Sequence, residues 1–140
     1  MNKVAILISL LVCGTASVFA GTYDDFPNPD VLADTDYVKA HIDDANVIIV
    51  DTRSADDYAA GHIPGAINIH GKSLRTGGGT SYIFHVNGID LAEADHDIAK
   101  YENVLGDAGI SNDKEVITYG VRGGRTDSTV LFVILDMLGH

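Results

Sequence analysis

"VIIVDTRSADDYAAGHIPGAINI", residues 47–69, carries the clearest structural signal in the chain. It begins with a continuous apolar run, which is typical of a strand buried on both faces of a parallel sheet. A short helix is expected next, because Ser54 with Asp57 three residues later resembles a capping box and Gly61 is placed to end the helix. The Pro-Gly pair at 64–65 then favours a turn into a second strand, "AINI".

The rest of the chain continues this alternation. The expected elements are helices within 30–43, over 97–110 and over 126–138, a loop over 70–96 and a buried strand over 115–119. Asp34 or Asp36 is expected to cap the first helix, and Gly109 to end the second. The apolar residues expected on one side of the last two helices are Ile98, Tyr101, Val104, Leu105, Ala108, Val130, Leu131, Ile134, Met137 and Leu138. Strands alternating with helices predict an α/β fold with a mainly parallel sheet.

Length and charge limit the function classes. A chain of 140 residues predicts a single domain, and a hydrophobic fraction of 46% is enough for a core. The formal net charge of −11 argues against nucleic acid as a partner, because phosphate binding needs a basic surface.

The first twenty residues have the pattern of a secretory signal peptide. Lys3 supplies a positive start, an apolar run follows, and Val18 and Ala20 occupy the small-residue positions before a cleavage site. A membrane anchor is the alternative, but Gly14 and the polar residues after it interrupt the run early. We therefore predict cleavage after Ala20, a mature domain over residues 21–140, and a periplasmic or secreted product that has no membrane segment.

Cysteine usage restricts the chemistry of that mature domain. Cys13 is the only cysteine, and it lies in the predicted signal peptide. The mature chain is therefore expected to have no disulfide and no thiolate nucleophile or metal ligand. No cofactor is predicted.

Two segments of the chain resemble the rhodanese-like (sulfurtransferase) family. The first runs from Asp51 and Arg53 through the acidic-aromatic pair at 57–58 to the "GHIPGA" string at 61–66. The second, "VITYGVRGGRTDSTVLFVILDMLGH" (116–140), resembles the family's active-site strand, loop and following helix. The resemblance implies a parallel sheet flanked by helices, with a persulfide-forming cysteine at the head of that loop.

Gly120 stands where the resemblance implies the cysteine. A thiolate is a strong nucleophile whose sulfur can carry a second sulfur, and glycine can do neither. The hydroxyls of Thr118, Thr126 and Ser128 cannot replace it, because oxygen does not form a stable carrier of sulfane sulfur. The chain thus resembles a cysteine-less first domain of a multi-domain thiosulfate or mercaptopyruvate sulfurtransferase, and we expect it to be catalytically inactive.

The resemblance also implies that the domain lacks its last strand. In the family another strand follows the helix that matches 126–138, and it lies inside the sheet rather than at its edge. Without this strand the neighbouring strands would keep open N–H and C=O groups. We therefore expect a marginal or aggregation-prone chain, or one that a partner completes.

The loop over 120–126 is the predicted anion-binding site. Its members are Gly120, Val121, Arg122, Gly123, Gly124, Arg125 and Thr126. Glycines allow close backbone approach, a helix N-terminus favours negative charge, and the arginines add positive charge. The ligand expected is a small oxyanion such as sulfate or thiosulfate, bound weakly. In the alternative interpretation, the loop only connects two elements and its arginines pair with surface carboxylates.

The residues of the first motif are predicted to be structural. Asp51, Arg53, Asp57 and His62 resemble catalytic groups, but the family and the spacing favour a supporting role. We expect Arg53 to bond a carboxylate of the helix or nearby carbonyls, and His62 to be a hydrogen-bond partner in the turn.

A metal site is not predicted. The acidic stretch at 93–97, with Glu93, Asp95, His96 and Asp97, cannot converge on one ion, and His70 and His85 have no defined spacing to it. We expect the stretch to be a solvated helix N-terminus instead. Two functions remain open: a sulfurtransferase-family protein whose chemistry sits on a further rhodanese domain, or a stand-alone envelope module that binds a small anion or a protein.

Overall fold

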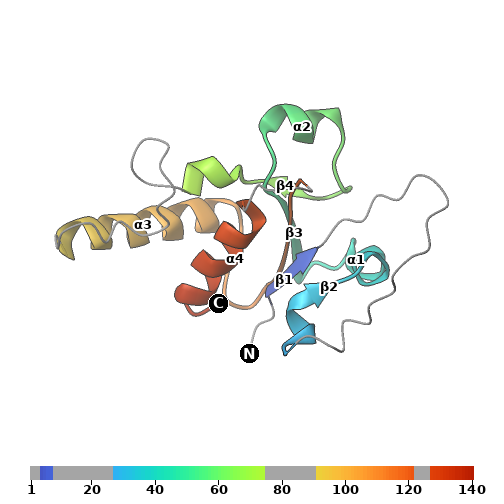
Figure 1. Cartoon of the computed structure of the whole chain (residues 1–140), viewed down its shortest axis with the longest axis horizontal. Helices are drawn as coiled ribbons and strands as arrows, with labels where there is room; N and C mark the ends of the chain where they lie inside the picture. The colour runs from blue at the N-terminus through green and yellow to red at the C-terminus, as the bar shows by residue number, and fades with distance from the viewer. Residues whose placement is uncertain (1–3, 8–26, 75–90, 122–126) are drawn as a thin grey trace.

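The computed structural model of the chain describes residues 4–7, 27–74, 91–121 and 127–140 (Figure 1). Its core is one sheet with the strand order β2-β1-β5-β3-β4, and all of the neighbouring pairs are parallel. The strands are β1 (Val4–Leu7), β2 (Leu32–Ala33), β3 (Val47–Asp51), β4 (Ile67–Asn68) and β5 (Glu115–Tyr119). The predicted α/β architecture with a parallel sheet is therefore confirmed.

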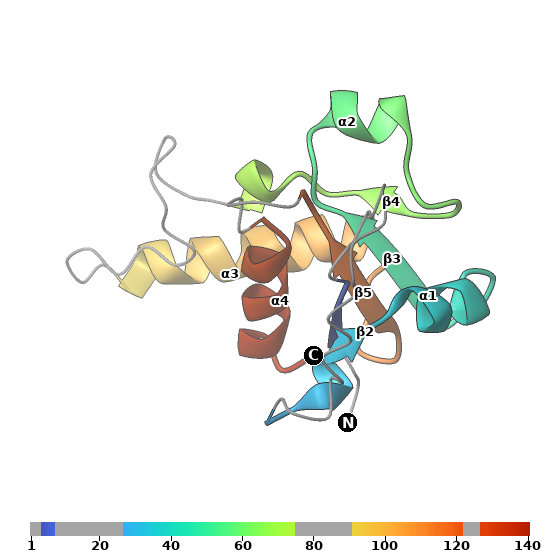
Figure 2. The same cartoon turned by 45° about the vertical axis from the view of Figure 1, so that its right-hand side comes forward.

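Helices cover both faces of this sheet. They are α1 (Thr35–His41), α2 (Ala55–Ala60), α3 (Leu91–Asp107) and α4 (Asp127–Met137), with short 3-10 helices η2 (Pro29–Val31) and η3 (Gly71–Leu74). Figures 1 and 2 show α3 and α4 on one side of the sheet and α1 on the other. Within the described residues, no helix combines the length and the apolar composition needed to cross a membrane.

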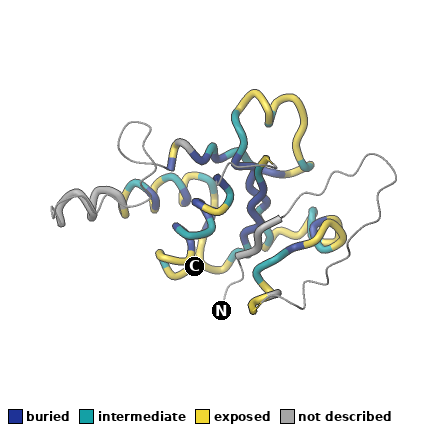
Figure 3. Tube along the Cα trace, in the orientation of Figure 1, coloured by how far each residue is buried: buried dark blue, intermediate teal, exposed yellow. Residues whose placement is uncertain are grey.

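The alternation of side chains along the strands creates two cores. Val50 and Val116 face α3 and α4, whereas Ile49 and Ile117 face α1. This follows from the two-residue period of a strand, which sends successive apolar side chains to opposite faces. Figure 3 shows the buried residues concentrated along β3 and β5 and the exposed residues around α2. Both faces of β3 and β5 are thus buried, as their continuous apolar runs predict.

The first helix begins at one of its two predicted caps, after a segment that is not helical. Val31 belongs to η2 and Leu32–Ala33 to β2, so these residues do not continue the helix. The side chain of Asp34 accepts hydrogen bonds from the backbone N–H groups of Asp36 and Tyr37, at 3.0 and 2.7 Å. This N-cap fixes the start of α1 at Thr35, and of the two predicted caps it selects Asp34.

Helix α3 begins earlier than predicted, at Leu91, so part of the expected loop over 70–96 is helical. It ends as expected at Gly109, whose φ of 79° allows the hydrogen bond from Ile110 N–H to Leu105 O that closes the helix. Ile98 is 38% exposed, which differs from the predicted core position, because this end of α3 extends beyond the sheet (Figure 1). On α4, Met137 is likewise exposed and Leu135 takes a buried place instead.

The largest difference concerns the N-terminal segment. β1 lies inside the predicted signal peptide, yet it forms a strand in the interior of the sheet, between β2 and β5. In the full chain residues 4–7 are thus part of the sheet, which the sequence analysis does not predict. β1 occupies the sheet position next to β5, and the absence of a later strand that the resemblance implies stays a prediction. Cleavage after Ala20 stays a prediction.

Candidate functional site

The candidate site lies where β3 and β5 end, at the carboxyl edge of the parallel sheet. Ligands of open α/β sheets bind at this edge, because the loops that leave the strands converge there. Thr52 follows β3 directly, and both its backbone N–H and its Oγ1 donate to the carbonyl of Tyr119, at 2.9 and 2.8 Å. These two bonds hold the end of β3 against the end of β5, where Gly120 follows.

Asp51 is the buried acceptor of this site. Its carboxylate is fully buried and accepts hydrogen bonds from Arg53 Nη2 at 2.6 Å, Arg53 Nε at 3.0 Å and Tyr119 Oη at 2.7 Å. Burial raises the pKa of Asp51, but the hydrogen bonds from Arg53 and Tyr119 outweigh it and bring the pKa below its ordinary value. Burial and the bond to Asp51 raise the pKa of Tyr119 to about 12, so its hydroxyl remains a donor at neutral pH.

The same three residues hold the loop that follows α2. Arg53 Nη2 donates to Gly61 O at 2.6 Å, and Tyr119 Oη accepts from Ile63 N–H at 3.1 Å. Two kinds of partner are expected for Arg53. The nearby carbonyl is found, but the carboxylate belongs to Asp51 on the sheet rather than to Asp57 on the helix. Arg53 therefore links the end of β3 to the loop that follows α2.

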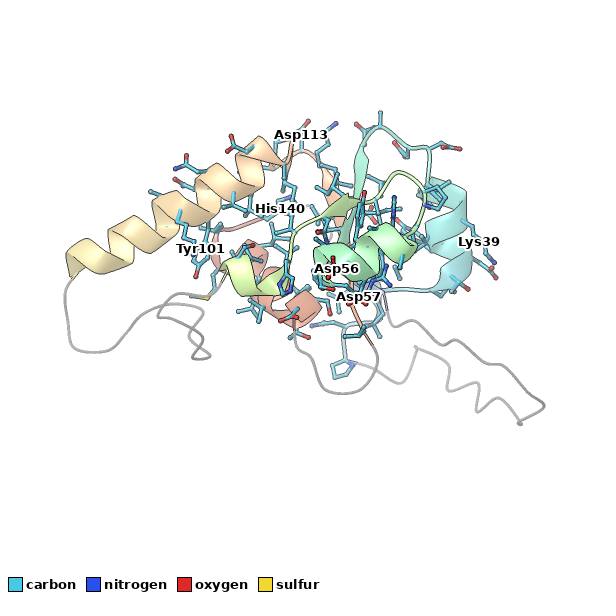
Figure 4. The ribbon with its side chains drawn as sticks, turned by 90° about the horizontal axis from the view of Figure 1, so that it is seen from above. Lys39, Asp56, Asp57, Tyr101, Asp113 and His140 are labelled. Atoms are coloured by element: carbon cyan, nitrogen blue, oxygen red, sulfur yellow. The ribbon has the colours of Figure 1, made fainter. Side chains whose placement is uncertain are left out.

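Within the described residues, the contacts of Asp57 and His62 are local. Asp57 lies on α2 (Figure 4), where its N–H donates to Ser54 Oγ at 3.2 Å and its Oδ2 accepts from the same hydroxyl at 2.6 Å. His62 stacks on Tyr58 with ring centroids 3.8 Å apart, and its Nδ1 lies 2.8 Å from the carbonyl oxygen of Tyr58. Tyr58 Oη in turn donates to Ala66 O at 2.6 Å. All of these contacts shape the loop from 54 to 66.

Gly120 sits in a tight polar corner. A Cβ added there would lie 3.0 Å from Thr52 Oγ1 and 3.5 Å from Ser128 Oγ on the first turn of α4. Any side chain at this position must therefore displace Thr52 by a few tenths of an ångström. Of the other predicted anion-loop residues, Val121 is 43% exposed. The remaining ones, over 122–126, lie outside the described residues.

Metal ligands do not converge in the part of the chain that the structure describes. There, no three histidine, cysteine, aspartate or glutamate residues lie together as a metal would require. Residues 93–97 fall in the first turns of α3, which is the place the sequence predicts for them. Cys13 and His85 are outside the described residues.

Sequence reasoning missed several residues that build this edge. The sequence analysis does not single out Thr52 or Tyr119, yet both are buried and join β3 to β5. It also missed Gly71, whose missing side chain makes room for Asp127 at the start of α4. No local pattern identifies this contact, because Asp127 is distant from Gly71 in sequence.

Comparison with known proteins supplies a family for this arrangement. Residues 34–140 match the family model "Rhodanese-like domain". A protein of Mycobacterium tuberculosis named "Putative thiosulfate sulfurtransferase" is 32% identical over 130 residues, which cover 81% of this chain and 41% of that protein. The "Thiosulfate sulfurtransferase" of Pseudomonas aeruginosa is 32% identical over 116 residues, covering 77% of this chain and 37% of its own length. This chain thus spans about two fifths of the relatives it matches. No solved structure is a significant match.

Proposed function

Because the chain belongs to the Rhodanese-like domain family, we propose that it is an exported sulfurtransferase-family protein without sulfur-transfer chemistry of its own. The observation that carries this proposal is Gly120 at the end of β5, on the site edge, where the family resemblance implies the sulfur-carrying cysteine. The predicted mature chain contains no cysteine, because the single cysteine of the sequence, Cys13, belongs to the predicted leader.

The surroundings of Gly120 support the loss of nucleophilic chemistry. The nearest side-chain atoms around a Cβ at this position are the hydroxyl oxygens of Thr52 and Ser128. Thr52 Oγ1 already donates its hydrogen to Tyr119 O at 2.8 Å. An oxygen nucleophile also cannot hold a transferable sulfane sulfur. The site therefore keeps the family's scaffold without its reacting atom.

Incubation with thiosulfate is expected to leave the mass of the protein unchanged. The protein to use is the Cys13→Ser variant, so that the leader thiol cannot react if it is still present. Electrospray mass spectrometry reads the result, since a persulfide adds one sulfur atom to the mass. A Gly120→Cys variant is the matched control, and we expect it to gain sulfur poorly, because its Cβ would crowd Thr52 Oγ1 at 3.0 Å. A gain of sulfur by the glycine protein contradicts the proposal.

We propose further that the loop over 120–126 binds a small oxyanion. Support comes from the place of α4, whose first turn lies beside Gly120 and whose free N–H groups favour negative charge. Arg122 and Arg125 add positive charge to the same loop. The buried Asp127 and the net charge of −11 oppose binding of an anion. Salt screens the long-range part of this electrostatic repulsion.

Sulfate is expected to bind with a dissociation constant on the order of millimolar, about −4 kcal/mol. An NMR titration should move the amide signals of Gly120, Val121 and Ser128 most, and Arg125→Ala should weaken the binding. Lys39→Ala is the control, because Lys39 is exposed on α1 (Figure 4) and pairs only with Asp36 at 3.3 Å. Equal weakening by both variants, or shifts centred elsewhere, would show that the loop only connects two elements.

The relatives' lengths favour one of the two functional settings. Since the chain spans 41% of the Mycobacterium tuberculosis relative, we propose that it acts beside a further rhodanese domain rather than as a stand-alone binding module. Genomic sequence downstream of the His140 codon tests this choice. A second rhodanese repeat with a cysteine supports it, and a stop codon supports the stand-alone module.

A further inference from the structure

The interior strand of the sheet comes from the segment that the sequence predicts to be removed. β1 pairs with β5 over Val4↔Val116 to Leu7↔Tyr119, and on its other side with β2 over Ile6↔Leu32 and Leu7↔Ala33. It therefore has hydrogen-bonded neighbours on both edges. These four residues also begin the apolar run that gives the leader its character.

Resting on the export proposed above, we propose that folding and export of this chain compete for residues 4–7. A membrane-inserted leader places the whole apolar run in lipid. The folded sheet instead places the first four residues of that run, Val4–Leu7, between β2 and β5. The same residues cannot occupy both places. A chain that folds before translocation therefore hides its leader in the sheet, and a chain that is translocated first cannot use this strand.

The dependence of β2 on β1 explains why the strand matters to the fold. In the described part of the chain, β2 hydrogen-bonds to the sheet only through β1. Loss of β1 would therefore detach β2 from the ladder and leave one edge of β5 without backbone partners. Val116, Ile117 and Thr118 of β5 are fully buried in the present arrangement. The vacated position would expose an apolar strand at the centre of the domain.

The proposal makes a statement about register that cross-linking can test. Leu7 and Ala33 are Cα partners, so cysteines at these positions lie on the same face of adjacent strands, within reach of a short thiol-bridging reagent. Ile6 pairs with Leu32 instead, so positions 6 and 33 are out of register by one residue. The matched pair of variants is Leu7→Cys/Ala33→Cys and Ile6→Cys/Ala33→Cys, both with Cys13→Ser.

Leader cleavage by signal peptidase in lipid vesicles tests the competition itself. We expect the folded full-length chain to be cut on the order of tenfold more slowly than the same chain diluted freshly from urea, because only the unfolded chain offers its apolar run to lipid. The Leu7/Ala33 pair should bridge on the order of tenfold faster than the Ile6/Ala33 pair. If a variant at Ala33 fails to fold, the pair Ala5→Cys/Ile117→Cys gives the same reading on the other side of β1. Measurable and equal cutting of the folded and unfolded chains, or equal bridging of the matched and shifted pairs, overturns the proposal, whereas no cutting of either chain overturns the proposed export.

Discussion

Replacement of Arg53 by methionine is expected to lower the free energy of unfolding by about 3 kcal/mol, because it leaves the buried Asp51 carboxylate without its cation. Arg53 reaches both oxygens of Asp51, with a shortest distance of 2.6 Å, while the Asp51 side chain is 0% exposed. The substitution also removes the bond to Gly61 O that holds the loop after α2. Urea denaturation followed by circular dichroism measures the loss.

Lys39→Met is the matched control for this change. The Lys39–Asp36 pair has side chains that are 75% and 89% exposed, so water and salt screen it almost completely. Such pairs contribute a median of about 0–1 kcal/mol, and we expect the lower end of that range. If Arg53→Met costs no more than Lys39→Met, the buried network does not support the fold as the structure indicates.

The pH dependence of stability should carry the signature of the same pair. The pKa of Asp51 is lower in the folded chain than its ordinary value of 3.8, so the folded chain favours the ionised form. The resulting stabilisation is present above that ordinary value and is lost as pH falls through the lower, folded pKa. We expect this acid-dependent loss to become smaller in Arg53→Met. An unchanged acid profile would mean that other carboxylates cause it.

Gly71→Ala is the second substitution with a large expected cost, about 2–3 kcal/mol. The added methyl carbon would lie 2.3 Å from the Cβ of Asp127 and 2.5 Å from its Cγ, distances at which something must move. Movement is costly on both sides. The N–H of Gly71 donates to Thr52 O at 3.2 Å, and Asp127 is the first residue of α4. Thermal unfolding by calorimetry would measure the effect.

Gly106→Ala provides the opposite expectation in the same chain. Gly106 lies in α3, and a Cβ there would meet no heavy atom within 4 Å. Alanine is favoured over glycine in a helix interior by about 0.8–1 kcal/mol, and Gly106 lies in the last turn, so a stabilisation below that value is expected. A stabilised or neutral Gly71→Ala protein would show that the contact between η3 and α4 is looser than the structure places it.

The sequence predicts those parts of the fold whose causes are local. The strands at β3 and β5 are continuous apolar runs, and Ser54, Asp34 and Gly109 act on groups within a few residues of themselves. The predicted strand over 115–119 has the same ends as β5, and the predicted last helix over 126–138 is one residue longer than α4 at each end. Local capping and burial on both faces of a sheet leave a readable pattern in one stretch of chain.

Other features depend on partners distant in sequence and could not be predicted in this way. Residues 32–33 have no strand pattern of their own, and in the described part of the chain they pair as a strand with β1 alone. Residues 4–7 read equally well as a leader, since an apolar run has the same composition in lipid and in a sheet. The hydrogen bond from Tyr119 Oη to Asp51 joins residues that are 68 positions apart, so no local sequence pattern predicts it. Three-dimensional pairing overrides propensity at these places.

Thiosulfate:cyanide sulfur transfer by the purified chain tests the central claim most directly. The account predicts that thiocyanate forms at the rate of the protein-free blank, at every protein concentration, because Gly120 supplies no atom to carry sulfur. The assay uses the Cys13→Ser variant, so that the protein contributes no thiol at all. The Pseudomonas aeruginosa relative serves as the comparison protein. Thiocyanate formation that exceeds the blank and rises in proportion to protein concentration would contradict the account.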